Sequence, residues 1–280
     1  MKSCKITKYY KQNFCPEADI IAIESLLSIE IIWGQFYNRT RTHLADLLRT
    51  PGHDYELALG LLFSLGIIKF SEDIIDYSLC TKALLDPQKP ARIVLELASH
   101  IFFKPQNFSP ASLRHAGCGM CTSPQEIPQV PALNLDTFEL ISAQTLLSCA
   151  QKLKPAQKIF NKTGGTHAAA LFDMHGTLQG LYEDVGRHNA LDKLIGFSLK
   201  LKNTNLNQAL VLMSSRASYE LIQKAHMAQI PLIATLGAVS TRARDYAEEF
   251  NITLVGFLRQ DSFNIYTHSH RIAQSYREHA

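Results

Sequence analysis

Short apolar segments alternate with longer amphipathic segments over the last third of the chain, and this alternation constrains the fold most. The apolar runs suit buried strands, and the amphipathic runs suit helices that cover a sheet. The expected order is strand Ala209–Met213, helix Ala217–Gln229, strand Pro231–Leu236, helix Thr241–Phe250 and strand Thr253–Leu258. Such alternation is typical of βαβ units. It therefore predicts the α/β fold class, with a largely parallel sheet.

Further elements are expected just before this alternation. An amphipathic helix is predicted over Thr137–Leu153, with Asp136 as its N-cap. Two short apolar segments, Ala168–Asp173 and Leu178–Tyr182, flank a turn signal and predict a hairpin. Gly186–Lys200 then predicts the helix that follows the hairpin. These elements extend the α/β part of the chain toward its middle.

The first half of the chain predicts strands mixed with one good helix. Ser28–Phe36 and Ala91–Leu97 have the composition of strands. Asp54–Ile68 follows a turn signal, Thr50-Pro51-Gly52, and its apolar spacing suits a helix that buries most of its surface. The first half is therefore expected to be α+β in character.

A long stretch without periodicity, Phe103–Leu133, separates the two halves and contains five prolines. Loops of this length inside compact proteins are usually functional or disordered. We expect it to join a smaller mixed α+β domain, residues 1–125, to an α/β domain, residues 126–280.

Composition excludes several classes of protein. A chain that is 46% hydrophobic and 19% charged is not intrinsically disordered, and a net charge of +3 gives no nucleic-acid footprint. The longest near-apolar run, Leu57–Ile68, is about half of the ~20 residues that a membrane helix needs. The start of the chain, Met1–Cys15, has lysines but no apolar core of a signal peptide. A cytoplasmic protein is therefore expected.

The six cysteines divide into isolated ones and one pair. A reducing compartment does not favour a disulfide framework, so each cysteine is filler, a metal ligand or a reactive thiol. The isolated ones, expected to be packing or surface filler, are Cys4, Cys15, Cys80 and Cys149. Cys118 and Cys121 form a CxxC pair inside the proline-rich stretch.

The CxxC pair has several possible roles. A structural zinc site is disfavoured because only His115 adds a nearby ligand to Cys118 and Cys121. Nucleobase-deaminase zinc is excluded, since no histidine starts an H-x-E motif and Gly117 stands where the proline belongs. A thioredoxin-like site needs a helix after the pair, and the prolines there argue against one. Two thiols on a flexible loop remain, and Arg114 would favour the reactive thiolate.

Three loops in the second half have the composition of anion sites. Adjacent glycines and helix starts expose backbone N–H groups that bind phosphates or carboxylates. The candidate contacts are Gly164, Gly165, His167, Arg187, His188, Lys193 and Arg216. In the alternative interpretation, Asp184 caps the helix, while Asp192 and the basic residues form a solvated face. Three such loops together favour a large, multiply charged ligand.

The expected parallel sheet predicts where such a ligand binds. Ligands of these sheets lie beyond the carboxyl ends of the strands. Those ends are Ser214–Arg216, Gly237–Val239 and Arg259–Asp261.

Taken together, these motifs resemble the formate dehydrogenase accessory sulfurtransferase family, FdhD. The resemblance rests on Leu48–Gly52, Cys118–Cys121, Thr163–His167, Glu183–Gly196, Ser214–Ala225, Leu254–Arg259 and Phe263–Tyr266. It implies a cytoplasmic sulfur carrier that accepts persulfide sulfur from a cysteine desulfurase. The carrier then transfers the sulfur to the molybdenum or tungsten bis(molybdopterin guanine dinucleotide) cofactor that formate dehydrogenase needs. The rival interpretation is a non-catalytic chaperone that binds this cofactor for formate dehydrogenase.

The resemblance also assigns roles to residues. Cys118 would carry the persulfide and Cys121 would support it, with no structural metal. The segment that would bind the guanine dinucleotide, as substrate, is Phe257, Leu258, Arg259, Gln260, Asp261 and Ser262. The family further implies a cytidine-deaminase-like α/β fold for the second domain, and a homodimer.

Overall fold

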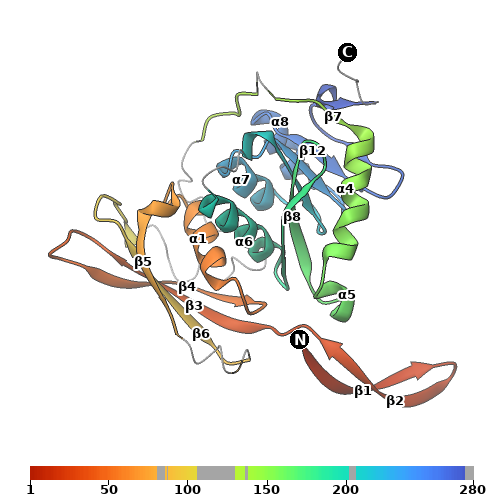
Figure 1. Cartoon of the computed structure of the whole chain (residues 1–280), viewed down its shortest axis with the longest axis horizontal. Coiled ribbons are helices and arrows are strands. Elements are labelled where there is room, and N and C mark those ends of the chain that lie inside the picture. The colour runs from red at the N-terminus through yellow and green to blue at the C-terminus, as the bar shows by residue number, and fades with distance from the viewer. Residues whose placement is uncertain (81–85, 87, 106–129, 136–137, 202–205, 275–280) are drawn as a thin grey trace.

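The computed structural model describes residues 1–280 except 81–85, 87, 106–129, 136–137, 202–205 and 275–280. Figure 1 shows a smaller sheet-and-helix unit beside a larger α/β unit, and a hairpin that projects away from both. Cys118, Cys121 and the expected cap Asp136 lie outside the described residues, as does the predicted domain boundary at residue 125. Predictions about the two cysteines and about this boundary stay predictions.

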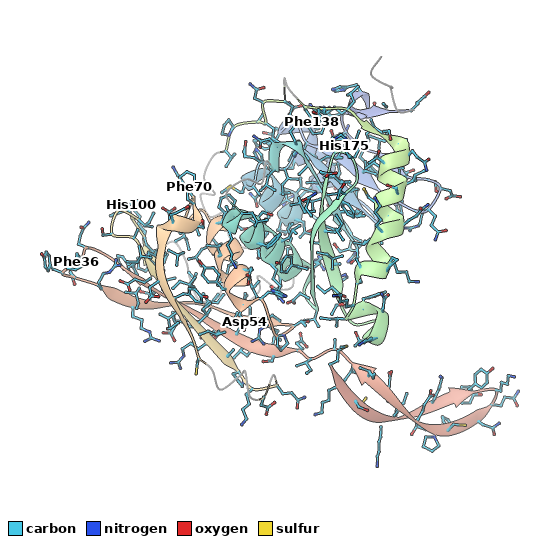
Figure 2. All side chains as sticks on the ribbon, viewed as in Figure 1. Phe36, Asp54, Phe70, His100, Phe138 and His175 are labelled. Atoms are coloured by element: carbon cyan, nitrogen blue, oxygen red, sulfur yellow. The ribbon has the colours of Figure 1, made fainter. Side chains whose placement is uncertain are left out.

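The smaller unit is a four-stranded sheet with one helix on its inner face. Its strands, in the order β4-β3-β6-β5, are β3 Ser25–Trp33, β4 Thr40–Arg49, β5 Ile74–Leu79 and β6 Ala91–Leu97. Helix α1, Asp54–Ser64, buries Leu57 and Leu61 against the alternate residues of β3, such as Ile29. The β3–β4 turn lies at one end of this unit, and Phe36 in the turn is 78% exposed (Figure 2).

The predicted helix and both predicted strands of this unit are confirmed, but two boundaries differ. Strand β3 runs from Ser25 to Trp33 rather than from Ser28 to Phe36. Helix α1 ends at Ser64 rather than at Ile68. Gly66 has a φ of 70°, a left-handed conformation that glycine adopts without strain, and its amide binds the carbonyl of Phe63. The apolar periodicity continues past this turn, which explains the longer prediction.

The larger unit contains a six-stranded sheet in the order β13-β12-β11-β10-β8-β9. Its strands are β8 His167–Asp173, β9 Leu178–Asp184, β10 Ala209–Met213, β11 Leu232–Thr235, β12 Thr253–Gly256 and β13 Asn264–Ile265. The predicted parallel pairing holds for β10, β11 and β12, which form the centre of the sheet. The predicted hairpin β8–β9 and the short β13 join this centre antiparallel, so the sheet as a whole is mixed.

Helices cover both faces of this sheet (Figure 1). They are α4 Ala143–Ala156, α5 Phe160–Thr163, α6 Arg187–Lys200, α7 Tyr219–Met227 and α8 Thr241–Glu249. Helices α6, α7 and α8 pack on one face, where Val211 and Ile233 are fully buried. Helix α4 packs on the other face, against Leu210 and Leu232. Successive residues of a strand thus enter different cores, which explains why these strands are apolar throughout.

Helix α4 begins later than predicted. Its N-cap is Ser142, whose hydroxyl accepts the amide of Thr145 at 3.0 Å. The expected start at Thr137 and the expected cap Asp136 are therefore wrong. The preceding strand β7, Ile141–Ser142, pairs in parallel with β14, Ile272–Ala273. This pairing to a distant part of the chain takes residues that helical periodicity had assigned to the helix.

The projecting hairpin was not predicted from the sequence. Strands β1, Lys2–Tyr10, and β2, Asn13–Ile21, pair antiparallel across a turn at Lys11 and Gln12. Both turn residues have positive φ, a conformation that hairpins usually assign to Asn or Gly. The sequence therefore lacks the ordinary turn signal.

Short 3₁₀ helices lie at η1 Ser71–Asp73, η3 Leu206–Gln208 and η4 Ser269–Arg271.

Two glycines bring the two units into direct backbone contact. Helices α1 and α6 lie side by side (Figure 1) and cross at Gly60 and Gly196. A Cβ on Gly60 would lie 1.9 Å from the carbonyl oxygen of Asp192, and one on Gly196 would lie 2.0 Å from that of Glu56. No larger residue fits at either position without separating the helices.

Within the described residues, no helix combines the length and apolarity that membrane spanning requires.

Candidate functional site

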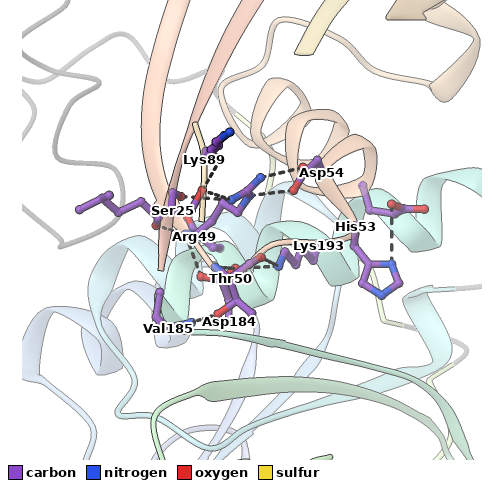
Figure 3. Close-up of polar contacts among 12 residues, drawn as sticks. Ser25, Arg49, Thr50, His53, Asp54, Lys89, Asp184, Val185 and Lys193 are labelled. Atoms are coloured by element: carbon purple, nitrogen blue, oxygen red, sulfur yellow. Dashed lines mark hydrogen bonds and ion pairs between the residues drawn. The ribbon is translucent and has the colours of Figure 1, made fainter. Parts of the chain in front are cut away.

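The longest sequence motif, Glu183–Gly196, lies between the two units, where it closes a buried polar network (Figure 3). The carboxylate of Asp184 is 0% exposed, lies 2.7 Å from the Lys193 ammonium and accepts the amide of Thr50 at 3.0 Å. Lys193 also donates to the carbonyl of Thr50 at 2.8 Å. The ammonium of Lys193 is thus directed into the interior, so we remove it from the predicted phosphate contacts.

The same network fixes the loop that enters α1. The side-chain amide of Asn189 donates to the carbonyl of Leu48 and to Asp184, at 2.8 and 3.0 Å. Arg49, 1% exposed, forms a bidentate ion pair with Asp54 at 2.8 and 2.9 Å (Figure 3). Because a buried charge that loses its partner is strongly destabilising, this network holds the two units in one arrangement.

The alternative interpretation of the motif as a solvated face is also wrong. Asp192 is 1% exposed and binds Lys224 and the hydroxyl of Ser64. Burial raises the pKa of Asp192, and the positive charge of Lys224 opposes that rise. The helix cap is Gly186, whose amide donates to Asp184. His188 is 2% exposed, so its ring also lies inside the protein.

A cavity of about 280 Å³ opens beyond the carboxyl ends of β10 and β11. Its lining residues are Arg187, Arg216, Ala217, Ser218, Ala238, Val239 and Ser240. Two of the loops that follow the parallel strands therefore do lie together, with the first residue of α6 beside them. The volume is at the lower limit of ligand pockets, roughly 300–1,000 Å³, so it suits one part of a large ligand.

Backbone hydrogen bonds hold the two loops of the cavity in register. The amide of Gly237 binds the carbonyl of Ser215 at 3.1 Å, and that of Ala217 binds the carbonyl of Ala238 at 2.9 Å. A Cβ on Gly237 would lie 2.9 Å from the Cα of Arg216, so only glycine fits there. The parallel pairing thus continues past the strand ends and gives the cavity a fixed wall.

The cavity is electropositive. Arg187 is half-buried and Arg216 exposed, and both residues belong to its lining. Helices α7 and α8 begin at the cavity, with Ser218 and Ser240 as their N-caps. The hydroxyl of Ser240 accepts the amide of Ala243, whereas the buried hydroxyl of Ser218 has no hydrogen-bond partner among the described residues. Two arginines and two helix N-termini together favour an anion such as a phosphate.

The glycine-rich loop before β8 lies outside the cavity lining. The Glu183 carboxylate accepts the amides of Ile159 and Phe160, at 2.8 and 2.7 Å, and so fixes the short helix α5. Gly164 ends α5 in a left-handed conformation, and with Gly165 it is exposed. These glycines serve the turn rather than the cavity.

His167 starts β8 opposite Asp184. Burial lowers the pKa of the His167 ring, and the positive charge of Arg187 lowers it further. His167 is therefore a neutral neighbour of the cavity near pH 7, able to donate or accept one hydrogen bond at each ring nitrogen.

The loop Phe257–Ser262 is continuous with the cavity wall. The amide of Phe257 binds the carbonyl of Gly237 at 3.0 Å, and the guanidinium of Arg259 binds the carbonyl of Leu236. Leu258 is 0% exposed and packs in the core, so its side chain anchors the loop and is removed from the predicted ligand contacts. The side chains of Phe257, Arg259, Gln260, Asp261 and Ser262 are exposed.

Comparison with known proteins identifies the family. The family model described as FdhD/NarQ matches residues 33–273. The chain belongs to the FdhD/NarQ family. One relative, from Streptomyces avermitilis, is called sulfur carrier protein FdhD and is 38% identical over 241 residues, 82% of this chain and 83% of the relative. Another of the same name, from Sulfolobus acidocaldarius, is 35% identical over 272 residues, 97% of this chain and 98% of the relative.

A solved structure agrees with the fold of this FdhD/NarQ member. The crystal structure described as a formate dehydrogenase accessory protein from Desulfotalea psychrophila has a TM-score of 0.73 at 21% identity. The match covers 97% of this chain and 98% of that chain. The mixed α/β architecture is therefore placed within a known fold.

One residue that the sequence did not single out, His226, holds the end of the proline-rich stretch in this FdhD/NarQ protein. Its Nε2 lies 2.9 Å from the carbonyl oxygen of Pro131, and its Nδ1 lies 2.9 Å from the hydroxyl of Tyr246. A carbonyl only accepts, so Nε2 carries the hydrogen and Nδ1 accepts from Tyr246. At the other end of the stretch, Phe103 is buried against Trp33. The stretch is thus anchored on both units.

Burial of His226 predicts a pH dependence of stability. Burial lowers its pKa from the ordinary value of 6.5. Below about pH 6.5 the unfolded chain therefore binds a proton that the folded chain does not, and the free energy of unfolding falls as the pH is lowered. The pKa values of His167 and His268 are lowered in the same direction and add to this slope.

We expect His226→Gln to flatten this pH dependence. Urea denaturation at about pH 7.5 and about pH 5.5 gives the difference in the free energy of unfolding for each protein. The difference is expected to be smaller for the variant than for the wild type. An identical difference in both proteins would mean that His226 titrates alike in the folded and unfolded chains.

Proposed function

We propose that this chain is a sulfur carrier for formate dehydrogenase. In this proposal Cys118 accepts persulfide sulfur from a cysteine desulfurase and transfers it to the molybdenum or tungsten bis(molybdopterin guanine dinucleotide) substrate. Support comes from relatives of nearly the same length that are called sulfur carrier protein FdhD, and from a chain that keeps the CxxC pair. A cytoplasmic location and a homodimer belong to the same proposal.

Loading of sulfur onto Cys118 requires only an exchange between a thiolate and a persulfide. The Cys118 thiolate attacks the outer sulfur of the desulfurase persulfide, the desulfurase thiolate leaves, and Cys118 becomes a persulfide. Loading transfers one sulfur atom without an external oxidant or reductant. An attack by Cys121 on Cys118 would leave a disulfide that must be reduced, so Cys121 has a supporting role.

The single structural observation that carries the proposal is the electropositive cavity at the strand ends. Arg187 and Arg216 suit the pyrophosphate of a guanine dinucleotide, and charge-assisted contacts to phosphate are strong. The cavity takes this part of the substrate, and the remainder extends over the neighbouring loop that carries Arg259. The isolated thiol of Cys149 does not compete, since burial raises its pKa to about 11.

Mass spectrometry after incubation with a cysteine desulfurase and cysteine tests the proposal. We expect the wild type to gain one sulfur atom on Cys118 and Cys118→Ala to gain none. Cys15→Ala, which removes an exposed thiol of the projecting hairpin, is the matched control and should load normally. Loading of Cys118→Ala at the wild-type rate would refute the persulfide role of Cys118.

The same samples distinguish the rival function. A wild-type protein that binds guanine nucleotide but gains no sulfur would instead support a cofactor-binding chaperone. Alkylation at graded pH adds a second measure, because a normal thiol pKa near ~8.5 at both Cys118 and Cys121 also favours the chaperone.

A further inference from the structure

We infer that one end of the smaller unit docks the cysteine desulfurase through exposed aromatic rings. This aromatic end is defined by Phe36, Tyr37, Phe70 and Phe102. The inference rests on the proposed function, which supplies a desulfurase as the sulfur donor. It goes further because it names the surface that the donor binds and the kind of contact that it makes there.

The aromatic end carries the most exposed apolar side chains of the described chain. Tyr37, Phe102 and Phe36 are 97%, 83% and 78% exposed, more than any other large apolar side chain among the described residues. Phe70 is exposed as well. Single exposed apolar residues are common, but several gathered in one place mark an interaction site. Because aromatic side chains supply much of the binding energy of protein interfaces, these rings suit a protein partner.

Strand topology brings the four rings to the same end of the smaller unit. Strands β3 and β6 are parallel, so the turn that follows β3, with Phe36, and the segment that follows β6, with Phe102, lie together. Strand β5 is antiparallel to β6 and begins at this end, shortly after Phe70. The rings of Phe103 and Trp33, whose centroids are 5.4 Å apart, connect the two loops directly. Figure 2 shows Phe36 and Phe70 on the side of the smaller unit that is remote from the projecting hairpin.

Polar contacts hold the loops of the aromatic end in fixed positions. The guanidinium of Arg39, at the end of the β3–β4 turn, donates to the carbonyl of Leu97 at 2.7 Å and ties the turn to β6. The carboxylate of Asp73 accepts the amide of Phe70 at 3.0 Å and lies 3.2 Å from Nε2 of His100. Loops that are already ordered lose little conformational entropy on binding. The aromatic end is therefore preorganised for a partner.

The attachment points of the CxxC stretch favour the sulfur donor as this partner. Pro105, the last described residue before Cys118, comes three residues after Phe102, so the segment with the thiol is attached at the aromatic end. Its other attachment is on the larger unit, where His226 holds Pro131. Persulfide sulfur passes by direct contact between two thiols, so the desulfurase has to dock beside this segment. The larger unit has the cavity proposed for the substrate, which leaves the aromatic end for the donor.

The test measures desulfurase affinity by biolayer interferometry and sulfur loading by mass spectrometry. The double variant Phe36→Ser/Tyr37→Ser removes two exposed rings, so it should fold normally and bind the desulfurase roughly 10- to 100-fold more weakly. Loading at a low desulfurase concentration should slow by a similar factor and recover at saturation, because Cys118 is unchanged. The matched control, Tyr9→Ser/Phe14→Ser, removes two exposed rings of the projecting hairpin and should bind and load as the wild type does.

The outcomes separate this inference from the proposal on which it rests. Phe102→Ser changes a different loop and should also weaken desulfurase binding. Wild-type affinity in both aromatic-end variants, or a loss of affinity only in the hairpin control, would overturn the inference. A wild-type dimer that only the double variant dissociates would assign the aromatic end to a second copy, and a selective loss of formate dehydrogenase binding would assign it to the recipient. Either result would also overturn the inference. A wild type that gains no sulfur from the desulfurase would instead refute the proposed function, and the inference with it.

Discussion

Replacing Gly196 with alanine is expected to lower the free energy of unfolding by more than ~3 kcal/mol, beyond the usual effect of overpacking. The new Cβ would lie 2.0 Å from the carbonyl oxygen of Glu56 and 2.9 Å from the amide nitrogen of Gly60. These are backbone atoms of α1 that no rotamer change can move. Alanine favours a helix over glycine by only about 0.5–1 kcal/mol, which does not offset the clash. Urea denaturation followed by circular dichroism measures the loss.

Gly180→Ala is the matched control for this experiment. Its Cβ would lie 2.9 Å from a ring carbon of Phe197, a side chain that can rotate away. We expect a loss below ~1 kcal/mol there. A Gly196→Ala protein as stable as Gly180→Ala would contradict the backbone contact between α1 and α6.

The second large effect is expected for Lys193→Met, at about 3–5 kcal/mol. The substitution keeps the apolar length of the side chain but leaves the carboxylate of Asp184 without its counterion at 0% exposure. Thr50 also loses a donor to its carbonyl. Chemical denaturation gives the loss of stability. Guanosine diphosphate affinity under native conditions should remain at the wild-type level, because Lys193 lies in the interior.

An exposed ion pair supplies the control for the buried one. Lys8 and Glu17 are 3.1 Å apart on the projecting hairpin, with side chains about half exposed. Lys8→Met should therefore change stability by less than ~1 kcal/mol. If Lys193→Met stays as stable as Lys8→Met but loses nucleotide affinity, the original assignment of Lys193 to a phosphate is right and its structural role is wrong.

The sequence predicted the strands best where they are buried on both faces. Ala209–Met213 matches β10 at both ends because its residues enter two different cores, which leaves a continuous apolar run. Ala91–Leu97 also matches β6, in which every second residue from Ala91 to Leu97 enters a single core. Boundaries shifted where a distant partner intervened, as at Ser142, whose strand pairing delays the start of α4. Local periodicity carries no information about such partners.

The site was predicted less completely than the fold. Parallel topology placed the loops that carry Arg216 and Val239 together, and the cavity confirms that these loops meet. From the sequence, Asp184 was interpreted as a helix cap and Lys193 as an anion contact. The sequence alone does not show whether a charged residue of a helix is buried. Their partners, such as Thr50, come from the other unit. Only the tertiary structure shows that this motif is an interface.

The crossing of α1 and α6 limits how this protein can diversify. Each unit contributes one helix whose backbone is left uncovered at a glycine, and the helix of the other unit packs directly against that backbone. Recombination that replaced one unit with an unrelated domain would expose that backbone and orphan the charges of Asp184 and Lys193. We therefore expect the two units to be inherited as one module, and new specificities to arise in loops such as Phe257–Ser262, which alter neither glycine.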